Sequence, residues 1–186
     1  MTFLPTEYFD YLADGHVDLW FKKRDFTTDQ KAEFLGILDD SGYTYDIVRK
    51  KDSELRIREK DVVRKDQPDV QGTVRFKKYG AQITVNLRST TIEEYRNLNT
   101  YIAHHEMGHA LGLAHRFNDP ITETVMNYPT FNEIATKQAT LTVTRGDLNN
   151  IRDFKNAILN DTQLIVGDDI LTGTHTCGPW CYHTAN

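Results

Sequence analysis

The segment His105–His115, which reads HEMGHALGLAH, constrains the fold of this chain more than any other stretch. An α-helix turns by about 100° per residue, so His105 and His109 would lie one turn apart and only about 40° around the same face. Two imidazoles in this arrangement can bind one Zn²⁺. Gly112 can adopt a positive φ, which lets the chain leave the helix and return His115 to the same ion. The segment therefore predicts a helix that stops at a tight turn.

The residue types in this segment also predict what the metal would do. Three protein ligands leave a fourth position for water, which is typical of catalytic rather than structural zinc. Glu106 follows the first ligand and is placed to act on that water as a catalytic base without being a ligand. Five fixed residue types at this spacing arise by chance with odds on the order of one in ten thousand. The competing interpretation is an ordinary amphipathic helix with histidines at its surface or in its core. That interpretation would suffice for a single histidine, but it does not explain three histidines, a glutamate and a glycine at this spacing.

The pattern HExxHxxGxxH, followed downstream by Met126, resembles the signature of the metzincin zinc peptidases. Gly108 and the run Leu111–Leu113 are similar to the matrixin form of this helix, and Asp147 matches an acidic position of the matrixin C-terminal helix. The resemblance implies a zinc-dependent endopeptidase with one catalytic zinc ion, acting on protein or peptide substrates. It also implies a secreted or extracellular protein, whereas the sequence itself leaves a cytoplasmic location open.

The resemblance also implies roles for residues outside the histidine segment. Met126 is expected to form an apolar floor beneath the ligands, and Ile102 to line the pocket for the side chain that follows the scissile bond. Tyr128 lies two residues after Met126, as in astacins and serralysins, and is a candidate catalytic residue that stabilises the oxyanion. Simple packing or a structural hydrogen bond is the alternative role for Tyr128. Arg116 departs from matrixins, which usually have serine there, and no cysteine precedes the motif, so the matrixin cysteine switch is not expected.

The apolar pattern predicts an α/β (α+β) fold like that of a metzincin catalytic domain, with a twisted mixed sheet of about five strands and three helices. Alternating apolar and polar residues indicate strands at His16–Lys22, Tyr43–Arg49, Glu54–Arg58, Gly72–Lys78 and Gln82–Leu87. Helical periodicity indicates helices at Thr28–Asp39, Ile92–Leu111 and Arg145–Leu159, so the zinc ligands fall on the long second helix.

Polar residues at the helix starts and the strand order refine this expectation. Helix starts are marked by three residue pairs, which are Thr27 with Gln30, Thr91 with Glu94, and Thr144 with Asp147. Of the predicted strands, Gly72–Lys78 is the candidate for the sheet edge, along which a substrate peptide would lie antiparallel.

Length and charge agree with a single catalytic domain. The chain has 186 residues, which suits one domain, predicted as residues 1–159, with a C-terminal tail of residues 160–186. A net charge of −5 argues against a protein whose main partner is nucleic acid or an anionic membrane. No apolar stretch is long enough for a transmembrane helix, and the N-terminus lacks the basic start of a signal peptide. We expect a monomer.

The predicted tail contains both cysteines of the chain, Cys177 and Cys181. Three interpretations compete, in decreasing order of preference: a small disulfide, a second zinc site, and a thiolate that blocks the catalytic zinc. The alternative function is therefore a zinc-containing binding or toxin-like module that recognises a partner through this tail, and a zinc hydrolase of non-peptide amides is a third. Asp66 and Asp69 could bind calcium, but a solvated loop is the preferred interpretation.

Overall fold

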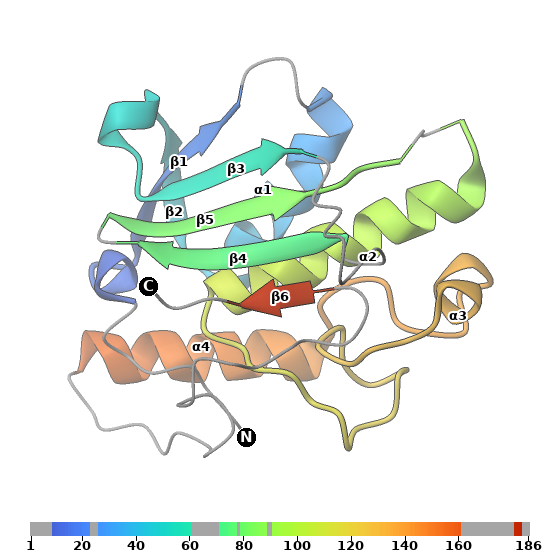
Figure 1. Ribbon diagram of the computed structural model, residues 1–186. Coiled ribbons are helices and arrows are strands. Elements are labelled where there is room, and N and C mark those ends of the chain that lie inside the picture. The colour runs from blue at the N-terminus through green and yellow to red at the C-terminus, as the bar shows by residue number, and fades with distance from the viewer. Residues whose placement is uncertain are drawn as a thin grey trace.

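The computed structural model describes residues 9–22, 26–60, 71–77, 79–88 and 91–160, together with the backbone of residues 181–183. Its centre is a mixed sheet with the strand order β2-β1-β3-β5-β4-β6 (Figure 1). The strands are β1 (His16–Phe21), β2 (Thr44–Ile47), β3 (Leu55–Glu59), β4 (Gly72–Lys77), β5 (Gly80–Val85) and β6 (Cys181–His183). Strand β4 runs antiparallel to β5, and the other four pairings are parallel.

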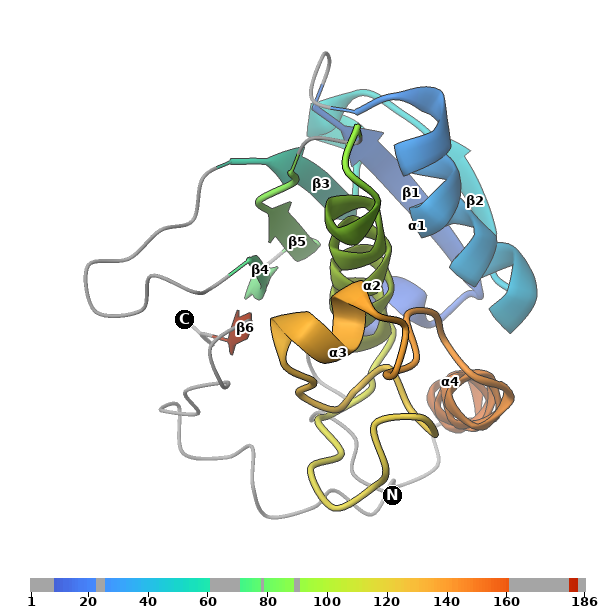
Figure 2. The same cartoon turned by 90° about the vertical axis from the view of Figure 1, so that its right-hand side faces the viewer.

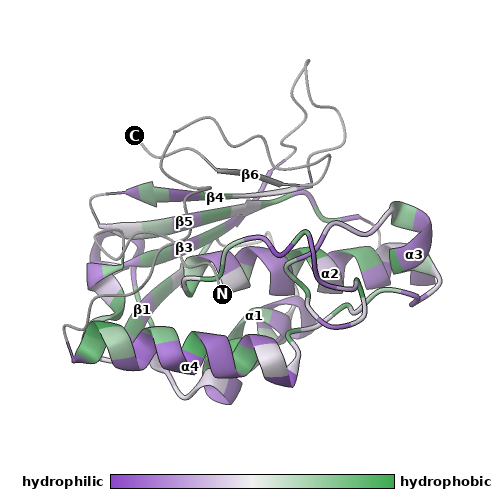
Figure 3. Cartoon of the chain, turned by 90° about the horizontal axis from the view of Figure 1, so that it is seen from below, coloured by the Kyte–Doolittle hydropathy of each residue, from purple (hydrophilic) through white to green (hydrophobic). Residues whose placement is uncertain are grey.

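The helices form a second layer against one face of the sheet, as Figures 2 and 3 show from two directions. They are α1 (Thr28–Ser41), α2 (Glu93–Ala110), the short α3 (Phe131–Ala135) and α4 (Arg145–Leu159). The hydrophobic core lies between the layers. Strand β1 shows how the sequence produces it, because Val17, Leu19 and Phe21 are buried and alternate with half-buried residues. Within the described residues, no helix combines the length and apolar character needed to cross a membrane.

The predicted elements are confirmed, each boundary lying within two residues of its expected position. The capping boxes at Thr27 and Thr144 both form. The cap predicted at Thr91 is wrong, because α2 starts one residue later with Ile92 at its N-cap and no side-chain cap bond. Helix α3 was not expected, although Thr130 and Glu133 form a capping box at its start.

The position of β4 in the sheet differs from the prediction. The sequence suggested Gly72–Lys78 as an edge strand, but β6 pairs with β4 in parallel, with Gly72 opposite Cys181 and Val74 opposite His183. The prediction is wrong for this part of β4 because β6 comes from more than a hundred residues further along the chain. A partner so distant, in a stretch without a clear strand pattern, leaves no mark on local periodicity.

The chain leaves α2 through a turn at Gly112, as the sequence predicts. Its φ is +97°, a conformation that other residues rarely adopt. A side chain there would also collide with α4, because an added Cβ would lie 2.8 Å from Cγ of Phe154 and closer still to two other ring atoms. Glycine is therefore required both for the backbone turn and for the packing of α4 under it, and this turn directs the chain toward His115.

Candidate metal centre

The three histidines of the motif converge on one point. His105 and His109 project from the last turns of α2, and their Nε2 atoms are 3.1 Å apart. His115 follows the turn at Gly112, and its Nε2 lies 3.2 Å from that of His105 and 2.9 Å from that of His109. The first two rings are 2% or less exposed, and His115 is half-buried. The helix spacing and the glycine turn thus bring together the residues that the sequence singled out.

Backbone carbonyl groups orient two of these rings. Nδ1 of His105 lies 2.7 Å from the carbonyl oxygen of Val125, and Nδ1 of His109 lies 2.7 Å from that of Leu113. A carbonyl oxygen only accepts, so each Nδ1 carries the hydrogen and each Nε2 presents a lone pair. These lone pairs meet without a hydrogen between them, which is an arrangement that a bound cation stabilises.

The donor set fits zinc. A tetrahedral ion with nitrogen ligands at about 2.0–2.1 Å would hold those nitrogens about 3.3 Å apart. The observed separations of 2.9–3.2 Å are close to this value. Three neutral imidazoles also match the ligand class of catalytic zinc. His105, His109 and His115 would hold the ion.

Glu106 lies beside this centre, on the side of α2 that faces β4. Its side chain is 1% exposed. It lies against the backbone of Gly72, where an added Cβ would be only 2.7 Å from Cγ and Cδ of Glu106. One residue after His105 along the helix, it is displaced by about 100° from that ligand. The carboxylate is therefore held between the histidine face of α2 and strand β4.

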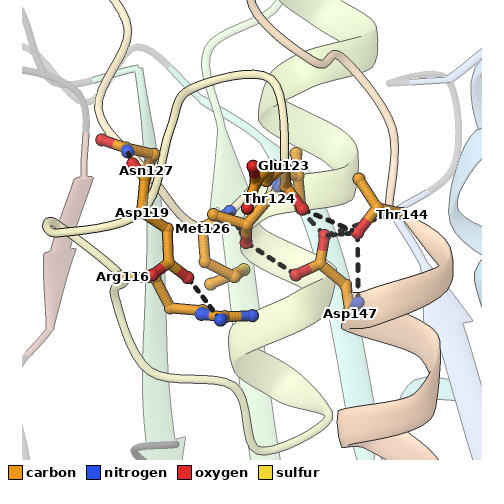
Figure 4. Close-up of polar contacts among 9 residues, drawn as sticks. Arg116, Asp119, Glu123, Thr124, Met126, Asn127, Thr144 and Asp147 are labelled. Carbon is orange, nitrogen blue, oxygen red and sulfur yellow. Dashed lines mark hydrogen bonds and ion pairs between the residues drawn. The ribbon is translucent and has the colours of Figure 1, made fainter.

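Met126 lies against Gly108 of α2, in a loop that Asp147 fixes. Met126 is fully buried, and its Sδ would be 2.6 Å from a Cβ added to Gly108. Asp147, also fully buried, accepts from the Thr124 hydroxyl (2.6 Å) and the Val125 N–H (3.1 Å), as Figure 4 shows in part. The same carboxylate accepts from the N–H and the hydroxyl of Thr144, both at 3.0 Å. Helix α4 is thereby joined to the loop that supplies the carbonyl for His105.

Tyr128 reaches the centre, and Ile102 is buried in the core. The Tyr128 hydroxyl lies 2.6 Å from Nε2 and 3.1 Å from Nδ1 of His115. Phe117, which is 54% exposed, lies next to both rings, with its centroid 5.4 Å from that of His115 and 5.1 Å from that of Tyr128. Ile102 is 2% exposed and belongs to the hydrophobic core. Its assignment to a substrate pocket stays a prediction.

One residue near the ligands was missed at the sequence level. The Tyr101 hydroxyl donates to the carbonyl of Asn127 (2.7 Å) and lies 3.1 Å from Nδ1 of His105, so it links α2 to the loop after Met126. Its position four residues before His105 was the available signal, because such residues share a helix face. His104 precedes the ligand His105, and its position about 100° around the helix argues against it as a ligand of the same ion; it is 9% exposed and does not point to the metal centre. Instead it bonds through Nε2 to Glu33 (3.1 Å).

Several predicted features lie outside the described residues. These are the calcium candidates Asp66 and Asp69, and Cys177 with most of the C-terminal tail. Only the backbone is described for Cys181, within β6. The three interpretations of the cysteines therefore stay predictions.

Comparison with known proteins gives a limited likeness. No family model matches the chain, and neither does any curated protein. Among solved structures, the chain is similar to the archaemetzincin of Archaeoglobus fulgidus, crystallised with malonate. That similarity has a TM-score of 0.44 and 15% identity, and covers 72% of this chain and 98% of the other. The α/β fold agrees with the one expected from the sequence, with His105 and His109 on α2 and His115 just after it. No match singles out matrixins, so that finer assignment stays a prediction.

Proposed function

We propose that this chain is a zinc-dependent endopeptidase. The observation that carries the proposal is the convergence of three histidine Nε2 atoms, 2.9–3.2 Å apart, next to a buried glutamate and a tyrosine hydroxyl. Three protein ligands leave a fourth position on zinc for water, as in catalytic sites. The carboxylate of Glu106 and the hydroxyl of Tyr128 beside this triad further favour catalysis.

The residues of this chain have separate roles in the proposed reaction. Zinc in such a site supplies Lewis acidity, which lowers the pKa of water and polarises a carbonyl group. The carboxylate of Glu106 takes a proton from the attacking water and later passes it to the leaving amine. The Tyr128 hydroxyl donates a hydrogen bond to the oxyanion that develops on the scissile carbonyl. The carbonyls of Val125 and Leu113 keep the hydrogens of their histidines on Nδ1 throughout.

A pair of variants separates the two halves of this proposal. Glu106→Ala should retain zinc and lose most peptidase activity, because general base catalysis contributes about 10²–10⁴-fold. His109→Ala should lose zinc as well as activity, because two histidines bind the ion weakly. Metal content by mass spectrometry and cleavage of a peptide library, with and without a chelator, measure both properties. Equal cleavage by Glu106→Ala and the parent would exclude the mechanism, and full zinc occupancy in His109→Ala would exclude the ligand assignment.

Substrate preference, a secreted location and a monomeric state are further parts of the proposal. They rest on the sequence motif and its resemblance to metzincins. Sequencing the cleaved library products gives the preferred side chains on either side of the scissile bond.

A further inference from the structure

Strand β4 carries a glycine where its neighbours on the same face carry large apolar side chains. Residues two apart on a strand share a face, so Gly72, Val74 and Phe76 all face the helices. Val74 and Phe76 are buried in the core. Gly72 is buried too, but no positive φ requires glycine there. Its backbone would accept other residues, and strands generally favour larger ones.

The space beside Gly72 is filled by Glu106. A Cβ at residue 72 would lie 2.7 Å from both Cγ and Cδ of Glu106, and closer still to Oε1. Ordinary contacts of a Cβ are 3.4–4 Å. An alanine would therefore force the carboxyl group to move by about 1 Å, a displacement that can cost on the order of 10²-fold in rate when it affects a catalytic group. Glu106 is 1% exposed, so it has little free space on its other sides.

We propose that Gly72 is a positioning residue for the Glu106 carboxylate. Because glycine has no side chain, it leaves room on β4 for this carboxylate, and this room sets where the catalytic base lies beside the histidines. This inference rests on the proposed function for its catalytic consequence, but its geometric part does not. Gly72 lies on β4, which pairs with β5 on one side and with β6 on the other, and this paired strand gives the carboxylate a rigid wall.

The first test measures the packing and needs no enzymatic activity. Gly72→Ala should lower the melting temperature of the full chain by about 5 °C, because overpacking a filled site is destabilising. In a Glu106→Ala background the added methyl group meets empty space, so the same substitution should cost less than half as much. An equal decrease in melting temperature in the parent and in Glu106→Ala would refute the contact between residue 72 and Glu106. Gly36→Ala is the matched control, because a Cβ there meets nothing within 4 Å and should not lower the melting temperature.

The second test measures catalysis on the zinc-loaded full chain. Gly72→Ala should lower kcat by about 10²-fold, with KM and zinc content close to those of the parent. Glu106→Asp shortens the side chain by one methylene, so adding Gly72→Ala to Glu106→Asp should cost much less than the same change costs the parent. A general structural defect would reduce kcat by the same factor in both backgrounds, and loss of zinc in Gly72→Ala would place the effect at the ligands. Either result overturns the proposal.

The two tests also separate this inference from the proposed function. A parent protein without chelator-sensitive peptidase activity would refute the proposed function, while the melting-temperature cycle would still report on the contact between Gly72 and Glu106. An active parent whose kcat does not respond to Gly72→Ala would refute the inference alone.

Discussion

Replacement of Asp147 by alanine should destabilise the protein and weaken its metal site together. The carboxylate is fully buried and accepts four hydrogen bonds, two from Thr144 and one each from Thr124 and Val125. A hydrogen bond to a charged group contributes about 1.5–3 kcal/mol, and such contributions overlap when they share one acceptor. We expect a net loss of about 4 kcal/mol, a large part of the 5–15 kcal/mol that stabilises a typical domain.

Thermal unfolding measures this loss. For a chain of this length, 4 kcal/mol corresponds to a decrease of about 10 °C in melting temperature. Asp153→Ala is the matched control, because Asp153 lies on the same helix but is exposed, and its removal should change the melting temperature by no more than about 2 °C. The network would be energetically unimportant if the two variants melted at the same temperature.

The same variant should also bind zinc about tenfold more weakly. Asp147 holds the N–H of Val125, and the carbonyl of Val125 accepts the Nδ1 hydrogen of His105. Loss of groups that orient metal ligands typically costs 10–100-fold in affinity. Competition with a chromogenic chelator gives the dissociation constant. An unchanged constant in a destabilised variant would show that the loop keeps His105 in place without Asp147.

Two further predictions concern single side chains. Tyr128→Phe should retain zinc and lower kcat by tenfold or more, because its hydroxyl lies at the centre beside His115; unchanged kcat would assign Tyr128 to packing. The hydrogen bond from His104 lowers the pKa of Glu33, so the ionised form of Glu33 stabilises the fold above its unfolded-state pKa, and this contribution is lost as the pH falls through the lowered value. Chemical denaturation from neutral to acidic pH should therefore show a smaller acid loss of stability in Glu33→Gln than in the parent, and parallel pH curves would contradict it.

The parts of this molecule that were predictable from sequence depend on local spacing. The placement of His105 and His109 follows from the helix period, and the role of Gly112 follows from its tolerance of positive φ. Likewise, each capping box, at Thr27 and at Thr144, forms between residues only three positions apart in the sequence. These features were confirmed because the physical cause and the pattern lie in the same short segment.

The features that were missed depend on contacts between distant segments. Nothing near Gly72 in the sequence indicates that Glu106 of another element fills the space beside it. The link from Tyr101 to Asn127 joins two segments in a similar way. Helix α3 has only five residues, which is too short for a periodic pattern to stand out. The cap at Thr91 failed for a local reason, since a shift of one residue in the helix start moves the capping position to Ile92.

The pairing of β6 with β4 means that an extended peptide added on this side of β4 competes with a segment of the same chain. An extended peptide that pairs with Gly72–Val74 on that side needs the backbone groups that Cys181–His183 already occupy. Because β6 is tethered, it acts at a fixed effective concentration that dilution of the protein does not reduce. The association constant measured for such a peptide is the intrinsic constant multiplied by the fraction of molecules in which β6 is not paired with β4. Peptides that bind without reaching Gly72–Val74 avoid this penalty, so β6 disfavours only those peptides that pair with this part of β4.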